Sequence, residues 1–137
     1  MSGPALRSRR WHSLIHNSTI ADIEAATEQI IEKMDLGAGD ARGHVDFLLD
    51  LWRSKVLSHA EEEENGLYEE IERAQPGSVC RIERVKRDHE ILAILVQQIE
   101  ELNSSTGNIG EILGINSAML RILELHDRDE EKLLPDP

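Results

Sequence analysis

The chain is 137 residues long, acidic and poor in aromatic side chains, with a net charge of −12 and 3% aromatic residues. This length suits one domain, residues 1–137, and the abundance of Glu, Leu, Ile and Ala favours helices over strands. The negative charge argues against nucleic-acid or anionic-membrane partners, because both repel an acidic protein.

The cysteine content and the hydropathy of the sequence are typical of a cytoplasmic protein. Cys80 is the only cysteine in the sequence, so no internal disulfide can form, which is typical of a reducing environment. The longest apolar run, residues 91–96, is far too short to cross a bilayer. The arginines near the N-terminus are not followed by an apolar signal segment. We therefore expect a cytoplasmic protein without a membrane partner, present as a monomer or a small homo-oligomer.

Apolar residues at helical spacing predict the first two helices. Residues 1–10 are expected to fray, and the first helix to run from about Trp11 to the glycines at 37 and 39. Asp40 is a candidate N-cap for a second helix over residues 41–73. The inward stripe of the first helix is His16, Ile20, Ile23, Ile30 and Met34. The inward stripe of the second helix is Val45, Leu48, Trp52, Val56, His59, Glu63 and Leu67.

Two more helices follow in the same manner. The third is predicted over residues 79–102, and the fourth from about residue 108 until Pro135 and Pro137 end it. The inward stripe of the third helix is Val85, His89, Leu92, Val96 and Ile99. The inward stripe of the fourth helix is Ile115, Met119, Ile122, His126, Glu130 and Leu133. Four helices joined by short turns predict an all-α fold, an antiparallel up-down-up-down four-helix bundle.

Two segments share the pattern HxxxE, at His59–Glu63 and at His126–Glu130. Residues four apart on a helix lie on one face, so each segment offers an imidazole and a carboxylate to one point. Chance spacing is the competing interpretation, because Glu is abundant and residues 61–64 also form a charge run that water can solvate.

The heights of the histidines along the helices favour a metal site. A helix rises 1.5 Å per residue, and counting from each turn places four histidines at one level of the bundle. Polar side chains on a core-facing stripe need partners, since burying them unpaired is costly. The predicted ligands are His16, His59, Glu63, His89, His126 and Glu130.

The same counting excludes other residues. His44 lies about 15 residues, or roughly 22 Å, from His59 and is expected near the opposite end of the bundle. His12, one turn before His16, is expected to face solvent, with a place beside the ligands as the alternative. Tyr68 is expected to be a core or surface residue, and Trp52 to be core.

The ordered set of His16, His59-x-x-x-Glu63, His89 and His126-x-x-x-Glu130 resembles the hemerythrin-like (HHE cation-binding) family over essentially the whole chain. Residues 59–68 and 126–135 resemble the family's second-helix and fourth-helix signatures. The resemblance implies a non-haem centre of two iron ions with a bridging oxo or hydroxo group. Glu63 and Glu130 would bridge the ions and the four histidines would be terminal ligands. Manganese is an alternative metal, because imidazole and carboxylate suit both.

The sequence departs from the oxygen-carrying members of that family. Their third helix carries HxxxH, but the second position here is Ala93, and the fourth helix carries Glu130 where they have Asp one residue later. Four histidines and two carboxylates cannot fill two six-coordinate ions, which favours reaction with a bound small molecule over its simple return.

Three functions are therefore weighed. The first is a peroxidase-like or catalase-like oxidoreductase that reacts with hydrogen peroxide, nitric oxide or oxygen. The alternative is an oxygen or iron binding, sensing or storage protein without turnover. The third is a metal-free helical interaction protein.

Overall fold

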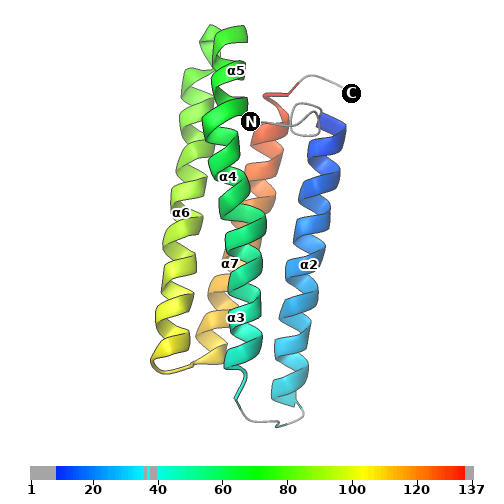
Figure 1. The fold of residues 1–137 in the computed structure, drawn as a ribbon, viewed down its shortest axis with the longest axis vertical. Helices are drawn as coiled ribbons and strands as arrows, with labels where there is room; N and C mark the ends of the chain where they lie inside the picture. Colours follow the sequence, from blue (N-terminus) through cyan, green and yellow to red (C-terminus); the bar gives the residue numbers. More distant parts are fainter. Residues whose placement is uncertain (1–8, 36, 38–39, 135–137) are drawn as a thin grey trace.

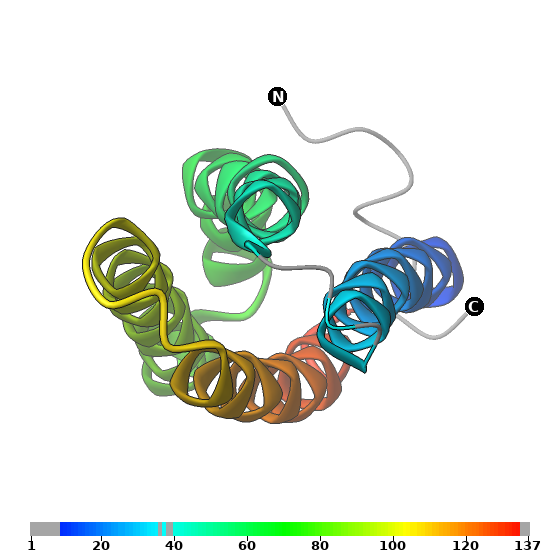
Figure 2. The same ribbon diagram turned by 90° about the horizontal axis from the view of Figure 1, so that it is seen from below.

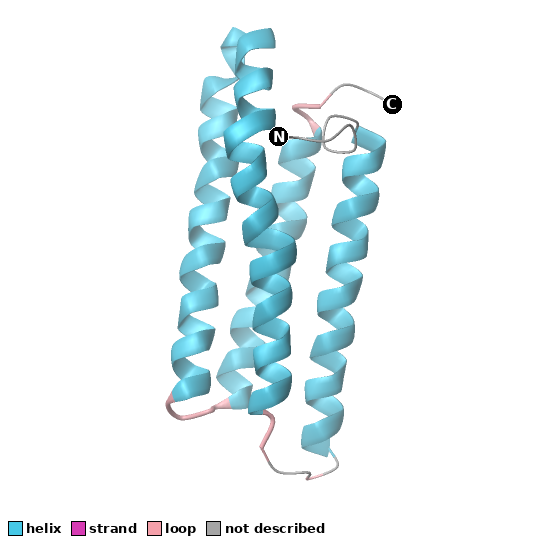
Figure 3. Ribbon diagram, viewed as in Figure 1, coloured by secondary structure: helices cyan, strands magenta, loops and turns pink. Residues whose placement is uncertain are grey.

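The computed structural model of the protein describes residues 9–35, 37 and 40–134, which fold into four helical rods (Figure 1). The first rod is α2 (Arg9–Asp35), the third is α6 (Val79–Ser104) and the fourth is α7 (Ile109–Glu131). The second rod is a continuous run of α3 (Arg42–Leu51), η1 (Trp52–Leu57), α4 (Ser58–Glu62), η2 (Glu63–Leu67) and α5 (Tyr68–Ala74). A short 3-10 turn, η3 (Pro76–Ser78), precedes α6. No strand occurs in these ranges (Figure 3), so the all-α prediction is confirmed.

The four rods enclose a common interior. Viewed from below, they stand at the corners of a four-sided arrangement (Figure 2). α3 contacts α2 and α6, and α7 contacts the same two helices from the opposite corner. None of the described helices is long and apolar enough to cross a membrane.

The interior holds two apolar clusters with a polar layer between them. The larger cluster includes Ile23, Trp52 and Leu92, and the smaller one includes Leu67 and Val85. On α6 and in the second rod, the predicted ligand positions lie between the residues of the larger cluster and those of the smaller one. The apolar layers therefore fix the height of the polar layer, because α6 and the second rod are anchored on both sides of it.

The predicted helix ends agree with the structure in most places. Gly37 has a positive φ of 61° and donates its N–H to Met34 O at 3.0 Å, as a helix-terminating glycine does. Ala41 occupies the N-cap position predicted for Asp40, although the Asp40 side chain still accepts from Arg42 N at 2.9 Å. Met34 is 46% exposed, so its predicted place on the inward stripe is wrong. The predictions for residues 1–8, Gly39, Pro135 and Pro137 lie outside the described residues.

The second rod contains two π-helical segments, η1 and η2, which flank α4. A π turn bonds residue i to i+5, so it adds one residue to a turn and changes the direction of the side chains after it. Tyr68 follows Glu63 by five residues across η2, and both side chains are buried. The widened turn thus brings Tyr68 to the same interior as Glu63.

Arg9 ties the start of α2 to the end of α7. Its Nε donates to Glu131 O and its Nη2 donates to Leu134 O, each at 2.9 Å. A guanidinium at a helix C-terminus satisfies carbonyl groups that have no partner within the helix. The contact fixes the first turn of α2, including His12, beside the last turns of α7.

Replacing Trp52 by Phe should lower the free energy of unfolding by about 1–3 kcal/mol. Trp52 is fully buried, and its Nε1 donates to Asn116 Oδ1 at 2.8 Å. Phe fills most of the volume but leaves that buried oxygen unpaired. Chemical denaturation of the metal-free protein measures the change. Trp11→Phe, at a position 54% exposed, is the control, and an equal effect in the two variants would contradict the expectation.

Candidate metal centre

Two groups of possible metal ligands lie in the polar layer. In each group the ligand atoms lie within 4.8 Å of one another. The first group is His12, His16, His59 and Glu63, and the second is Glu63, His89, His126 and Glu130. Glu63 belongs to both groups, which makes it the link between two adjacent sites.

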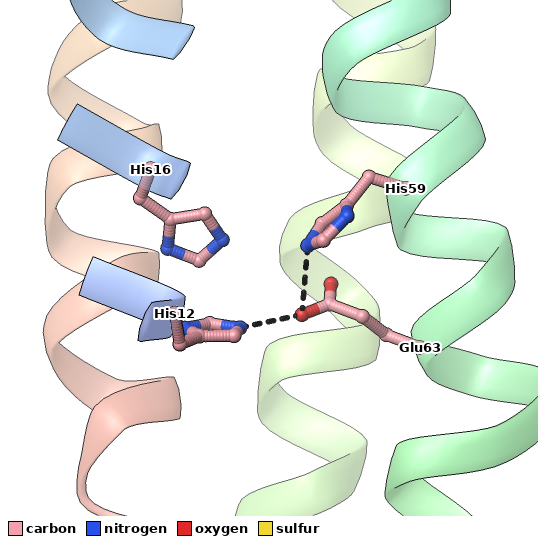
Figure 4. Close-up of side chains that lie close together, drawn as sticks. All are labelled: His12, His16, His59 and Glu63. Atoms are coloured by element: carbon pink, nitrogen blue, oxygen red, sulfur yellow. Dashed lines mark hydrogen bonds and ion pairs between the residues drawn. The ribbon is translucent and has the colours of Figure 1, made fainter. Parts of the chain in front are cut away.

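The carboxylate of Glu63 faces histidines on both sides. Its Oε2 lies 2.9 Å from His12 Nε2 and 3.5 Å from His59 Nε2 (Figure 4). Its other oxygen, Oε1, lies 3.5 Å from His89 Nε2. Because the two oxygens face different histidines, this carboxylate is placed to bridge two ions.

Glu130 is the second carboxylate between the groups, and it is fully buried. Its Oε1 contacts His12 Nε2 and lies 3.8 Å from His16 Nε2. Its Oε2 lies 3.0 Å from His126 Nε2 and accepts a hydrogen bond from the Tyr68 hydroxyl. Glu130 therefore faces α2 with one oxygen and α7 with the other.

Three of the histidines have an outer carboxylate beside Nδ1, and for His89 and His126 the contact is a hydrogen bond. Nδ1 of His16 lies 2.7 Å from Asp127 Oδ1, Nδ1 of His89 lies 2.8 Å from Glu64 Oε2, and Nδ1 of His126 lies 3.0 Å from Asp88 Oδ2. In metal sites, such a carboxylate fixes the ring and the tautomer, and it makes the other nitrogen more basic. In all three residues that other nitrogen, Nε2, faces the interior.

The buried charges shift one another's pKa values. Burial alone would lower the pKa of His12, but contacts with Glu130 and Glu63 outweigh it and raise that pKa to about 10. Burial also opposes the charged form of His126, yet Asp88 and Glu130 raise its pKa well above the usual range. The pKa of Glu63 is lowered despite its burial, because Glu130 and the histidines hydrogen-bond to it. Without a metal, protons on the histidines balance the buried carboxylates.

The donor set fits a pair of iron or manganese ions. Five imidazoles and two carboxylates converge, and Cys80, the ligand type that zinc and copper(I) favour, is exposed elsewhere. Within the described part of the chain, His59 Nε2 is buried and makes no hydrogen bond, since its contact with Glu63 Oε2 is a long one of 3.5 Å. A buried imidazole nitrogen without a partner is costly, and a metal ion would satisfy it.

The comparisons with known proteins agree with this arrangement. Residues 15–136 match the family model described as the hemerythrin HHE cation binding domain. The chain belongs to the hemerythrin family. No curated protein and no solved structure matches it.

All six residues predicted from the sequence lie in the two groups of this hemerythrin domain. The solvent-facing position predicted for His12 is wrong, because the side chain is fully buried against Glu63 and Glu130. His12 precedes the residues that match the family model. The signal for it was its spacing from His16, since residues four apart on a helix share a face.

Four further residues considered in the sequence, Tyr68, Trp52, His44 and Ala93, differ in their distance from the centre and in their burial. Tyr68 is buried and contacts Glu130, with its hydroxyl 3.4 Å from His89 Nε2. Trp52 is core as predicted, and His44 is only partly buried and belongs to neither ligand group. Ala93 is exposed and lines a groove that also reaches His89.

Metal binding should release protons from the hemerythrin domain. A ligating imidazole must be unprotonated, but the raised pKa values of His12 and His126 keep both protonated near neutral pH in the metal-free protein. The apparent metal affinity should therefore rise with pH until about 10, the pKa of His12, and fall in acid. Titrating metal-free protein with ferrous ion in weak buffer, with a pH indicator, measures the protons. Release of none would contradict the protonation described here.

Proposed function

We propose that this hemerythrin domain, an antiparallel four-helix bundle, holds two iron ions bridged by Glu63 and Glu130. His12, His16 and His59 would hold one ion, and His89 and His126 the other. The observation that carries the proposal is the position of Glu63, whose two oxygens face the two sets of histidines. When bound, a redox-active pair of ions supplies Lewis acidity and electrons to a small ligand.

We propose further that the protein is an oxidoreductase acting on hydrogen peroxide, nitric oxide or oxygen. Reduction of peroxide to water consumes protons, and the chain places a protonated hydroxyl, which donates a hydrogen bond, at the centre. The Tyr68 hydroxyl donates to Glu130 Oε2. Burial raises the pKa of Tyr68, and the nearby charges of Glu130 and Glu63 raise it further, so the hydroxyl keeps its proton at neutral pH.

Turnover by the iron-loaded protein tests this function. Peroxide should disappear at a rate proportional to iron content, and nitric oxide should raise the rate if it serves as the reductant. Metal-free protein is the control. Stoichiometric reaction followed by no further loss of peroxide, both with and without nitric oxide as the reductant, would contradict the oxidoreductase.

Tyr68→Phe should slow peroxide consumption by about tenfold to a hundredfold while iron content stays unchanged. Phe keeps the buried ring but removes the O–H that contacts Glu130. The assay compares rates per iron in the two proteins. An unchanged rate would show that Tyr68 supplies no proton, and a loss of iron would show that its role is to hold the ligands.

Binding without turnover is the second candidate, and His12 favours it. The ion held by three histidines and the two carboxylates would have one open coordination position of six. The ion held by two histidines and the same carboxylates would have more open positions. Ligand access to one ion suits reversible binding. Stopped-flow mixing of the reduced protein with oxygen decides between the two, because the oxidoreductase should oxidise and a binding protein should form an adduct that vacuum reverses.

A further inference from the structure

A small cavity of about 20 Å³ lies against the candidate centre. Its walls include His16 and His59 from one ligand group and His89 and His126 from the other. Val56 and Leu123, members of the larger apolar cluster, close another side of it. Such a volume holds about one molecule the size of water. The end of an external ligand that contacts the centre would therefore lie here.

A larger groove of about 420 Å³ runs along the outside of this cavity, between α2 and the η1–α4 part of the second rod. Thr19, Lys55 and His59 line both the groove and the cavity, and we call these three residues the neck. The His59 side chain is 17% exposed, more than that of any other histidine in the two groups. The centre is thus closest to solvent at the neck.

Lys55 gives the neck its charge. Among the residues that the structure describes, it is the only lysine or arginine that lines the groove or the cavity. Within the described ranges it forms no ion pair, so its ammonium group is not neutralised by a carboxylate. The outer groove contains Asp22 and Glu62, and the whole chain has a net charge of −12. Lys55 therefore offsets a field that would otherwise repel an anion.

No such cation stands among the described residues that line the opposite approach to the centre. A second groove reaches His89 from the outer side of the second rod and α6, where Ala93 lies. Its lining includes Glu61, Glu64 and Glu90 and no lysine or arginine. The described lining of this groove therefore offers an anion carboxylates and no ammonium or guanidinium group, although Glu90 is paired with Arg87 at 2.8 Å.

We propose that small molecules reach the centre through the neck and that the charge of Lys55 adds small monoanions of two or three atoms to the neutral molecules that this route admits. The inference rests on the proposed function, because it requires ions at the centre, and it adds the class of ligand that the site admits. Azide is the probe, since it carries one negative charge, is small and gives an optical band on ferric ions.

The test is an azide titration of the iron-loaded, oxidised protein and of charge variants. Lys55→Met should weaken azide binding by about threefold to tenfold, Lys55→Glu should weaken it more, and Lys55→Arg should restore it. Lys33→Met is the matched control, because it removes the same charge from α2 about 14 residues, or roughly 21 Å, beyond Thr19. Binding of neutral nitric oxide to the reduced protein should not change in Lys55→Met.

Equal azide affinity in wild type and Lys55→Met would overturn the proposal, and so would equal losses in Lys55→Met and Lys33→Met. A parallel loss of nitric oxide binding would show that Lys55 acts by shape and would also overturn it. Failure of the proposed function has a different signature, because wild type and every variant would then lack iron or the azide band.

The route is tested separately from the charge. Ser58 is exposed and lines the groove at the neck, so Ser58→Trp should slow azide association by about tenfold or more without changing iron content. Ala93→Trp, at the exposed position on the opposite groove, should leave the rate unchanged. Slowing by Ala93→Trp alone would place the route on that side and overturn the proposal.

Discussion

Replacing Glu63 by Ala is expected to remove nearly all of the iron from the protein. Glu63 belongs to both ligand groups, and its oxygens face His12, His59 and His89. The variant deprives both ions of a ligand at once. Loss of an outer carboxylate alone typically costs 10- to 100-fold in metal affinity, so we expect a loss of more than about 100-fold here.

The metal-free form of Glu63→Ala should also be less stable, by roughly 3–5 kcal/mol, because buried imidazolium groups lose the carboxylate that balances them. Iron determination after loading, and denaturation without metal, measure the two effects. Glu62→Ala is the matched control, since Glu62 is the preceding residue, is exposed and belongs to neither group. Full iron content in Glu63→Ala would mean that the metal lies elsewhere.

Replacing His12 by Ala is expected to reduce the iron content from about two ions per chain to about one. His12 contacts both Glu63 and Glu130, and it lies beside His16 with ring centroids 3.9 Å apart. The ion that would be held with His16 and His59 loses a histidine, whereas the ion at His89 and His126 keeps both. Loss of a direct ligand should weaken that first ion by at least the 10- to 100-fold of an outer partner.

Iron determination together with the optical spectrum measures this loss. His44→Ala is the control, because His44 is a histidine on α3 that belongs to neither group. Unchanged iron content and spectrum in His12→Ala would restore the set of four histidines predicted from the sequence. Loss of iron in His44→Ala would contradict the placement of the centre.

The height of the polar layer could be predicted because a helix has a constant rise per residue. His59 and Glu63 stand on one face at a level set by the turn after α2, and His126 and Glu130 stand on one face of α7. Neither inference needs knowledge of side-chain packing. The six predicted residues come together for this reason.

His12 could not be placed in the same way, because the apolar residues around it indicate the wrong face. Trp11 is 54% exposed and Leu14 is 50% exposed, so the apolar pattern at the start of α2 does not mark the interior. The four-residue spacing between His12 and His16 was the only sequence feature that indicated an inward-facing His12. Arg9, which bonds to carbonyls at the end of α7, holds this turn in place, and that contact joins residues far apart in the sequence.

The role of position 93 could not be inferred from a missing motif. The sequence shows that the second histidine of the third helix is absent, but a ligand set is completed in space and not along one helix. His12 on α2 approaches Glu63 and Glu130, while Ala93 faces outward from α6. The candidate centre therefore gathers five histidines, one more than the four predicted from the sequence.

Tyr68 depends on backbone geometry that the sequence does not reveal. A regular α-helix brings residues three and four apart to one face, but Tyr68 follows Glu63 by five. The π-helical segment η2 accounts for the difference. No composition signal in residues 63–67 distinguishes this widened turn from an ordinary one.

Mössbauer spectroscopy of the oxidised protein, loaded with the iron-57 isotope and paired with iron determination, tests the central claim most directly. Two ions that share Glu63 and Glu130 but differ in histidine number should give about two irons per chain and two distinct doublets of equal area. They should give no magnetic splitting at low temperature, because bridged ferric ions couple. About one iron per chain, or the magnetic pattern of isolated ferric ions, would contradict a bridged pair at these residues.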